Sequence, residues 1–326
     1  MQDIMKDFSF ELPTKLEFGS GKIEVLNKRL HEMDIERLLI VTDEGIRESG
    51  ILDRVLSRIQ NVELKIYDEV EPNPKDHQVE KGTEIAREFR PDGMLAVGGG
   101  SPIDCAKGIG VLLNENGEKI SNYYGKETVS GEILPFIAIP TTAGTGSEVT
   151  FSAVITDSET ERKMSIRSPY IAPDLSILDP GLTISLPKSL TSYSGMDAFT
   201  HAIEAYTATT ATVITDSLAL RSIELILDNI ERVIEKPEDI EARAAMLLGS
   251  TMAGIAFNHS DVASVHCMAE SLGGEYDAPH GLCNSIILPY MMEYNTDHCT
   301  EKYARVARLM GYEFEDPLVG AEKLVE

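Results

Sequence analysis

The segment GMLAVGGGSPIDCAKG, residues 93–108, carries the strongest fold signal in this chain. An apolar run leads into three consecutive glycines, and a helix-forming segment follows. Ser101 can cap that helix, Pro102 suits its first position, and Asp104 stands where the acid of a capping box belongs. Glycines let the backbone approach a pyrophosphate, and a helix N-terminus supplies aligned N–H groups. The segment therefore predicts a strand, a phosphate-binding turn and a helix, although an ordinary capped turn has a similar composition.

The surrounding sequence alternates between strands and helices. Apolar, β-branched runs predict strands at 37–43 (RLLIVTD), 62–68 (VELKIYD) and 133–140 (ILPFIAIP). Helical spacing of apolar residues predicts helices over 49–60 and 76–89, with EPNP at 71–74 as a breaker. This βαβα pattern favours a parallel sheet covered by helices. The glycine segment is not GxGxxG, so a standard Rossmann fold does not follow from it.

The character of the chain changes after Pro187. From Ser189 onward the sequence shows helical periodicity, few β-branched runs, and small residues suited to close helix contacts, as in MLLGSTMAG at 246–254. We therefore expect an α/β domain over residues 1–187 and an all-helical domain over residues 188–326. No internal repeat or low-complexity segment is visible.

A second polar loop follows a predicted buried strand. PTTAGTGSEVT, residues 140–150, offers the hydroxyls of Thr141, Thr142, Thr145 and Ser147 among flexible glycines. Ligands bind at the carboxyl ends of parallel strands, so this loop is a candidate cofactor contact, although a polar surface turn would have the same residues. Asp43 ends an earlier strand. Its carboxylate could accept a hydrogen bond from a ribose 2′-hydroxyl, or it could simply initiate a turn.

Four residues of the second half form a candidate metal site. Asp197 and His201 are spaced i, i+4, which places them on one face of a helix, and His266 and His280 follow downstream. Imidazole and carboxylate together suit Fe(II), Zn(II), Co or Ni better than Ca or Mg. Each motif alone has an ordinary explanation: a surface pair, a core histidine, a helix cap. Their combination with nucleotide-binding loops favours a metal beside a dinucleotide, and therefore hydride transfer.

Composition limits the classes of protein to which this chain can belong. The 326 residues are 42% hydrophobic and 25% charged, as expected for a globular protein with a sizeable core. The net charge of −25 argues against nucleic acid and anionic membranes as partners. No run approaches the roughly 18 apolar residues of a membrane span. The N-terminus lacks signal-peptide features and the four cysteines lack framework spacing, so we expect a cytoplasmic protein with reduced thiols.

Taken together, these motifs resemble the iron-containing (group III) alcohol dehydrogenase family, which shares its architecture with glycerol dehydrogenase and dehydroquinate synthase. The matching segments are VTD at 41–43, GGGSPIDCAK at 98–107, PTTAGTGSEVT at 140–150, LDP at 178–180, GMDAFTHAIEAY at 195–206 and HCMAESLGGEYDAPHG at 266–281. The resemblance implies a dinucleotide-binding domain, a helical domain, and a metal in the cleft between them.

The resemblance also implies residue roles. It makes Asp197, His201, His266 and His280 the ligands of one divalent metal, Fe(II) or alternatively Zn(II). The cofactor would be NAD(H), and Asp43 matches the position that favours it over NADP(H). Cofactor-binding positions implied by the family, or offered by the loops themselves, are Asp43, Gly98, Gly99, Gly100, Ser101, Asp104, Thr141, Thr142, Thr145, Ser147, Lys163 and Leu182. We also expect a homodimer or a higher homo-oligomer.

The chain departs from the family pattern at two places. Many members carry a further histidine four residues after the third ligand, where this chain has Glu270. Because His266 and Glu270 are i, i+4, we expect Glu270 near the metal, where it could orient a ligand histidine or relay a proton. His259 is a second candidate proton carrier, or else a surface histidine. Relative to the family, the helical domain is expected to be short at its C-terminus.

The predicted function is NAD- and metal-dependent hydride transfer involving small primary alcohols, diols or hydroxy-aldehydes. The metal would act as a Lewis acid on the substrate oxygen, and the nicotinamide would carry the hydride. Alternatives are a glycerol dehydrogenase-like enzyme, a lyase of the dehydroquinate synthase kind, and a non-enzymatic metal- or nucleotide-binding protein. The lyase would need a glutamate ligand in place of Asp197 and a set of basic residues that residues 189–290 supply only sparsely.

Overall fold

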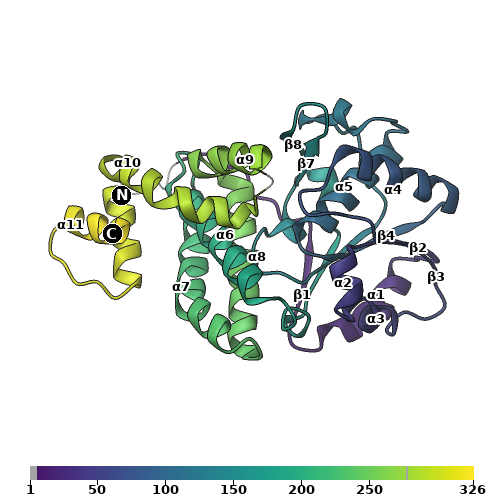
Figure 1. Cartoon of the computed structure of the whole chain (residues 1–326), viewed down its shortest axis with the longest axis horizontal. Helices are drawn as coiled ribbons and strands as arrows, with labels where there is room; N and C mark the ends of the chain where they lie inside the picture. The colour runs from purple at the N-terminus through teal and green to yellow at the C-terminus, as the bar shows by residue number, and fades with distance from the viewer. Residues whose placement is uncertain (1–5, 277) are drawn as a thin grey trace. The chain divides into compact units, whose positions relative to one another are not determined.

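A computed structural model of the chain describes residues 6–276 and 278–326 (Figure 1). These residues form two compact units. The sheet unit consists of Leu12–Thr142 and Ser147–Leu186. The helical unit consists, among the described residues, of 6–11, Ala143–Gly146 and the chain from Pro187 onward. The predicted fold class, an α/β part followed by an all-helical part, is confirmed.

Six parallel strands form the main sheet of the sheet unit, in the order β1-β9-β6-β4-β2-β3. Their bounds are β1 Lys15–Phe18, β2 Arg37–Val41, β3 Glu63–Tyr67, β4 Gly93–Gly98, β6 Phe136–Pro140 and β9 Leu175–Leu178. Apolar side chains fill β4 and β6 completely, as strands buried on both faces require. The register pairs Gly98 of β4 with Pro140 of β6, which brings the two predicted nucleotide loops to the same edge of the sheet.

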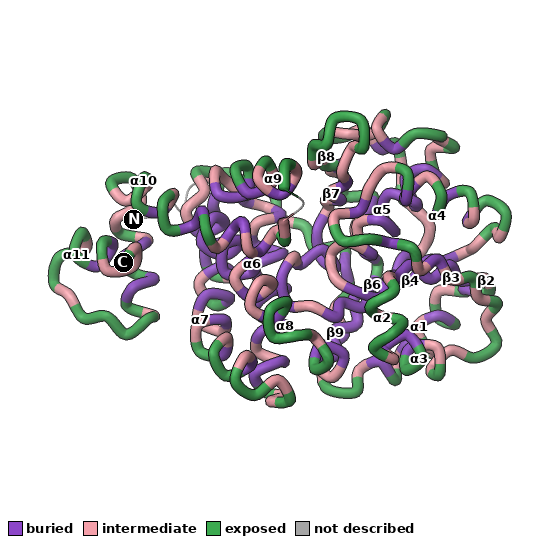
Figure 2. Tube along the Cα trace, in the orientation of Figure 1, coloured by how far each residue is buried: buried purple, intermediate pink, exposed green. Residues whose placement is uncertain are grey.

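Alternate residues of these strands enter two separate cores. Leu39 and Met94 pack with α4 and α5 on one face, whereas Ile40 and Leu95 pack with α1 and α3 on the other (Figure 1). The central strands are correspondingly buried throughout (Figure 2). The helices of this unit are α1 Leu26–Glu32, α2 Glu44–Glu48, α3 Ile51–Leu56, α4 Asp76–Phe89 and α5 Gly100–Asn114, with single 3-10 turns at η1 Lys22–Val25, η2 Ile120–Tyr123, η3 Ser147–Val149, η4 Pro169–Ile171 and η5 Pro180–Leu182.

Three details differ from the sequence prediction. The helix expected over 49–60 is shorter, α3 at Ile51–Leu56, and α2 at Glu44–Glu48 precedes it without having been predicted; Gly50 between them adopts φ 76° and is the N-cap of α3. The strand expected from 133 begins only at Phe136, after Pro135. A second sheet, in the order β5-β8-β7, was not predicted (β5 Gly125–Lys126, β7 Ser152–Asp157, β8 Arg162–Arg167). Its β7–β8 hairpin is antiparallel and largely polar.

The helical unit contains the remaining helices. They are α6 Lys188–Thr207, α7 Val213–Glu235, α8 Ile240–Ser260, α9 Ser264–Tyr276, α10 His280–Leu309 and α11 Pro317–Val325. Small residues let α8 approach its neighbours, and Gly249 packs against Ile226 of α7. By length and composition α8 is the one described helix that could cross a membrane, but 61% of its apolar window is buried within the protein, as in the core helix of a globular domain.

Candidate functional site

Helix α6 provides the first pair of predicted metal ligands. Asp197 and His201 lie one turn apart and are only 3% and 5% exposed. His280 is the first residue of α10, and Gly281 beside it lets that helix start against α6. A Cβ at Gly281 would lie 2.0 Å from the backbone oxygen of Tyr193, so no larger residue fits at this position without moving the helices. The fourth predicted ligand, His266, is a buried residue of α9.

Potential ligand atoms of these residues face one another. Single ligand atoms of Asp197, His201 and His266 all lie within 4.8 Å of one another. Asp197 has its Oδ2 3.9 Å from Nδ1 of His201 and its Oδ1 3.9 Å from Nε2 of His266. Nε2 of His280 lies 3.7 Å from the same Oδ1 but outside that group of three. These distances exceed hydrogen-bond length. Two ligands about 2.1 Å from one ion stand roughly 3 to 4 Å apart, so the spacing suits a shared metal.

The protonation and hydrogen bonding of these side chains are also consistent with a bound metal. Burial lowers the pKa of His201 to about 3, so its imidazole is neutral and can donate a lone pair. Its Nδ1 is buried and has no hydrogen-bond partner among the described residues. Burial raises the pKa of Asp197, but the surrounding imidazoles and the amide of Asn284 lower it further than burial raises it. A buried carboxylate beside an unsatisfied imidazole nitrogen is costly unless a cation is bound, so the donor set is consistent with a divalent metal.

Two residues outside the predicted ligand set contact it. Oε2 of Glu204, on α6, lies 2.5 Å from Nδ1 of His266. Nδ2 of Asn284, on α10, donates to Oδ1 of Asp197 at 2.7 Å and lies 3.2 Å from Nε2 of His266. Sequence reasoning missed both, although spacing pointed to them. Glu204 is one turn beyond His201 on α6, and Asn284 is one turn beyond His280 on α10.

The two predicted proton carriers lie in different surroundings. Glu270 is half-buried on α9, so it is not in open solvent. The carboxylate that contacts the ring of His266, however, is that of Glu204. His259 has both ring nitrogens close to backbone groups: Nδ1 lies 2.9 Å from the oxygen of Ile255, and Nε2 lies 3.2 Å from the nitrogen of Glu11 and 2.8 Å from its oxygen. Its ring also stacks on Phe10 at 4.2 Å. These contacts place the His259 ring against Phe10 and Glu11 of the segment 6–11.

The glycine segment at the end of β4 forms the expected strand–turn–helix. Gly98 has φ 150°, and a Cβ there would lie 2.6 Å from Pro102 and 3.3 Å from Oδ2 of Asp43, so glycine is required. The predicted cap is wrong in detail. α5 begins at Gly100 with Gly99 as its N-cap, which places Ser101 and Pro102 inside the first turn, and no side chain caps the helix. An uncapped N-terminus leaves backbone N–H groups to bind an anion.

Asp104 and Ser147 belong to a buried polar network centred on Lys107. The Ser147 hydroxyl donates to Asp104, which also accepts from the Val154 backbone at 3.0 Å. Lys107 has no exposed surface. Its Nζ donates to three backbone oxygens and two hydroxyls, namely Ser147 O and Oγ, Thr150 O and Oγ1, and Ser152 O, at 2.7–3.1 Å. The network fixes the segment 147–154 against α5.

The other predicted cofactor residues are distributed as follows. Oδ1 of Asp43 caps α2 by accepting from Ile46 at 2.9 Å, which leaves Oδ2 beside Gly98. The backbone nitrogen of Thr141 donates to Gly98 at 2.9 Å, while its buried hydroxyl has no partner in the described part of the chain. Thr142 lies against Gly99. The charge of Lys163 on β8 acts on Asp104. Leu182 is a core residue, 1% exposed, and Thr145 lies in the helical unit.

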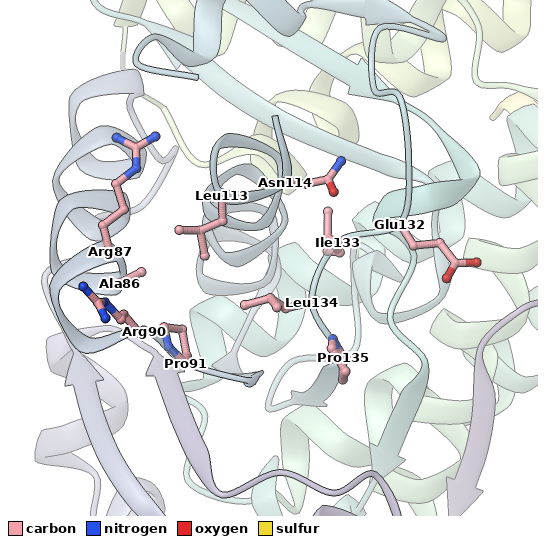
Figure 3. A pocket seen from close by; sticks show the side chains of 10 residues that line it. All are labelled: Ala86, Arg87, Arg90, Pro91, Leu113, Asn114, Glu132, Ile133, Leu134 and Pro135. Atoms are coloured by element: carbon pink, nitrogen blue, oxygen red, sulfur yellow. The ribbon is translucent and has the colours of Figure 1, made fainter. Parts of the chain in front are cut away.

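A pocket elsewhere in the sheet unit lies between α4, α5 and the segment before β6 (Figure 3). The pocket is lined by Ala86, Arg87, Arg90, Pro91, Leu113, Asn114, Glu132, Ile133, Leu134 and Pro135. It contains none of the residues predicted for the metal or the cofactor.

Comparison with known proteins agrees with the resemblance seen in the motifs. Residues 13–180 match the iron-containing alcohol dehydrogenase family, and residues 191–326 match the C-terminal part of the Fe-containing alcohol dehydrogenases. The 1,3-propanediol dehydrogenase of Klebsiella pneumoniae is 41% identical over 308 residues, covering 93% of this chain and 79% of that protein. The NAD-dependent methanol dehydrogenase of Bacillus methanolicus is 38% identical over 305 residues, covering 93% and 80%.

Solved structures lead to the same conclusion. A crystal structure of a 1,3-propanediol oxidoreductase is similar with a TM-score of 0.95 and 40% identity, covering 98% of this chain and 85% of that one. The predicted family and fold class are therefore confirmed by sequence and by structure. The chain belongs to the iron-containing alcohol dehydrogenase family and is an oxidoreductase that acts on alcohols.

Proposed function

We propose that this enzyme transfers hydride between NAD(H) and small primary alcohols or diols, with a divalent metal, Fe(II), held by Asp197, His201, His266 and His280. The observation that carries the proposal is the cluster of one carboxylate and three imidazoles, whose facing atoms are too far apart for hydrogen bonds and suitably spaced for a shared ion. Relatives named for 1,3-propanediol and methanol support small alcohols as the substrate class.

The four ligands would set the net charge of the metal site. When bound, the metal supplies a Lewis acid for the substrate oxygen. Asp197 contributes a negative charge, while the imidazoles add none, so the site would keep a net positive charge that attracts an alkoxide-like oxygen. Burial of Asp197 and His266 keeps water away from the inner side of the site. Glu270, half-buried one turn beyond His266, is proposed to carry the substrate proton toward solvent.

The sheet unit would bind the dinucleotide. The uncapped N-terminus of α5, together with Gly98–Ser101, supports a pyrophosphate site. Oδ2 of Asp43 lies beside Gly98 and would accept a hydrogen bond from the ribose 2′-hydroxyl of NAD, whereas it would repel a 2′-phosphate. Thr141 and Thr142 lie next to the same glycines and would contact the cofactor from the neighbouring strand. We further propose a cytoplasmic location, which the absence of disulfides between the four described cysteines supports.

The test is a panel of alcohols with purified enzyme loaded anaerobically with Fe(II) or Zn(II). NADH formation at 340 nm with primary alcohols and diols is expected, and a phosphorylated cyclic substrate should give no reaction. His266→Ala should lower both bound metal and turnover. His298→Ala is the matched control, because His298 is an exposed histidine of the same helical unit. Full metal content and full activity in His266→Ala would contradict the ligand assignment. No NADH from any alcohol would contradict the substrate class.

A further inference from the structure

Glu204 connects the proposed metal site to the start of helix α9. It lies on α6, three residues after His201, and its side chain is buried, with 4% of the residue exposed. Oε1 accepts from the backbone nitrogen of Val265 at 2.7 Å, and Oε2 accepts from that of Ala263 at 3.0 Å. A longer contact of 3.4 Å joins Oε2 to the nitrogen of His266. A single buried carboxylate thus binds three consecutive or near-consecutive backbone N–H groups.

These contacts make Glu204 the N-terminal cap of α9, although it belongs to another helix. The first N–H groups of a helix have no partner within the helix, and the helix dipole favours a negative charge beside them. Both carboxylate oxygens of Glu204 accept hydrogen bonds from backbone N–H groups, so the side chain is placed as an acceptor rather than as a donor. An ionised side chain at this position binds the donors more strongly than a neutral one would.

The same carboxylate also contacts the ring of His266. Oε2, which already accepts from the backbone nitrogen of Ala263, lies 2.5 Å from Nδ1, so Nδ1 is the donor of this hydrogen bond. The other ring nitrogen, Nε2, faces Asp197 at 3.9 Å and is the atom whose lone pair would be available to a metal. Glu204 consequently selects the tautomer and the ring orientation that a metal ligand needs.

We propose that Glu204 is a positioning residue that couples metal binding to the order of α9. It holds His266 ready for the metal and holds the first turn of α9 at the same time. A cation bound at Nε2 would make the Nδ1–H group a stronger donor to Glu204 and would thereby stabilise the cap. Coupling between two equilibria is reciprocal, so the factor by which metal binding stabilises the cap is also the factor by which loss of the cap lowers the affinity for the metal. The inference rests on the proposed assignment of His266 as a ligand.

The decisive variant is Glu204→Gln, which keeps the size of the side chain but removes its charge. Its affinity for Zn(II), measured by competition with a chromophoric chelator, is expected to fall about 10- to 100-fold. The absorption spectrum of the Co(II)-loaded variant should shift, because the His266 imidazole changes its donor strength. Hydrogen exchange of the amides at 263–266 should be faster than in the wild type, and adding Zn(II) should slow it less.

Asp239→Ala is the control for the loss of a helix cap. Asp239 caps α8 by accepting from Ala242 at 3.1 Å, and it belongs to the same unit without contacting a predicted ligand. Its loss should lower the melting temperature but leave Zn(II) affinity and the Co(II) spectrum unchanged. Glu204→Asp provides a second test if Glu204→Gln does not fold. It retains the charge but shortens the side chain, so it should bind Zn(II) with an affinity between that of the wild type and that of His266→Ala.

The outcomes separate the two proposals. If Glu204→Gln, or Glu204→Asp when only that variant folds, binds Zn(II) as the wild type does while His266→Ala does not, the coupling is wrong and the ligand assignment stands. If His266→Ala also binds Zn(II) as the wild type does, the ligand assignment itself is wrong. A spectrum of Co(II)-loaded Glu204→Gln identical to that of the wild type would equally overturn the coupling. Weaker Zn(II) binding, a shifted spectrum and faster exchange at 263–266 together would support it.

Discussion

Lys107→Met should destabilise the sheet unit strongly. Methionine matches most of the length of the lysine stem but has no donor. Lys107 is completely buried, and its ammonium group donates to the backbone oxygens of Ser147, Thr150 and Ser152 at 2.7–3.0 Å. The substitution therefore leaves three buried carbonyl oxygens without this donor and removes the positive charge 3.9 Å from Asp104.

The magnitude follows from these contacts. A buried carbonyl that loses its partner costs about 1–3 kcal/mol, so three would cost roughly 3–9 kcal/mol if nothing relaxed. The hydroxyls of Ser147 and Thr150 can rotate toward the orphaned oxygens, and water can enter, so the lower half of that range applies. Breaking a buried ion pair by removing one partner costs about 3–5 kcal/mol in general. We expect a loss of about 4 kcal/mol, a large part of the stability of a typical protein.

Equilibrium unfolding in urea, followed by far-ultraviolet circular dichroism, measures this loss. Tryptophan fluorescence cannot be used, because the chain has no tryptophan. Lys28→Met is the matched control: Lys28 is 70% exposed and forms only a surface pair with Glu32 at 3.6 Å, so its loss should change stability by less than about 0.5 kcal/mol. If the two variants unfold at the same urea concentration, the reasoning about the buried network is wrong.

Three further predictions concern the cofactor, the helix contact and the proton path. Asp43→Gly should raise the ratio of NADP(H) to NAD(H) use, measured as the ratio of kcat/KM values, because it removes a charge that repels the 2′-phosphate; a wild type that already prefers NADPH would contradict this. Gly281→Ala should lower stability by about 1–3 kcal/mol through overpacking against Tyr193, and it should lower bound iron more than Gly311→Ala does. Glu270→Gln should change the pH dependence of kcat while leaving iron content intact; an unchanged profile would exclude Glu270 as the proton carrier.

The fold was predictable where local signals agree. The apolar runs at 37–41 and 93–98 and the amphipathic segment 76–89 are strand, strand and helix as expected, because burial on the two faces of a parallel sheet demands those patterns. The sequence did not indicate the β7–β8 hairpin. Its strands are short and bury only Ala153 and Ile155 on β7 and Ile166 on β8, so the alternation is too brief to distinguish a strand from a loop. The helix α2 was missed because its five residues are too few to show a helical period.

The candidate site, like the fold, could be predicted from the sequence only in part. Asp197 and His201 could be paired from their spacing, since an i, i+4 relation is fixed by the helix itself. The roles of Glu204 and Lys107 could not be predicted from the sequence, because each depends on a contact with a segment more than 35 residues away in the chain. Only the fold brings these segments close together. Ser101 was expected as the cap because serine is a good N-cap, but the helix begins two residues earlier, with Gly99 as its N-cap.

The distribution of the chain between its two units limits how this protein can be divided. The chain passes between the units at 11/12, 142/143, 146/147 and 186/187. Residues 6–11 contact the helical unit through Phe10 and Glu11, which lie against His259 of α8. In the short segment 143–146, a Cβ at Gly146 would lie 2.6 Å from Gly254 of the same helix. A gene fragment starting at Pro187 would therefore encode an incomplete body with uncovered surfaces on α8. Exchange of whole halves between related enzymes should fail for the same reason, unless these two short segments are transplanted with the helices they contact.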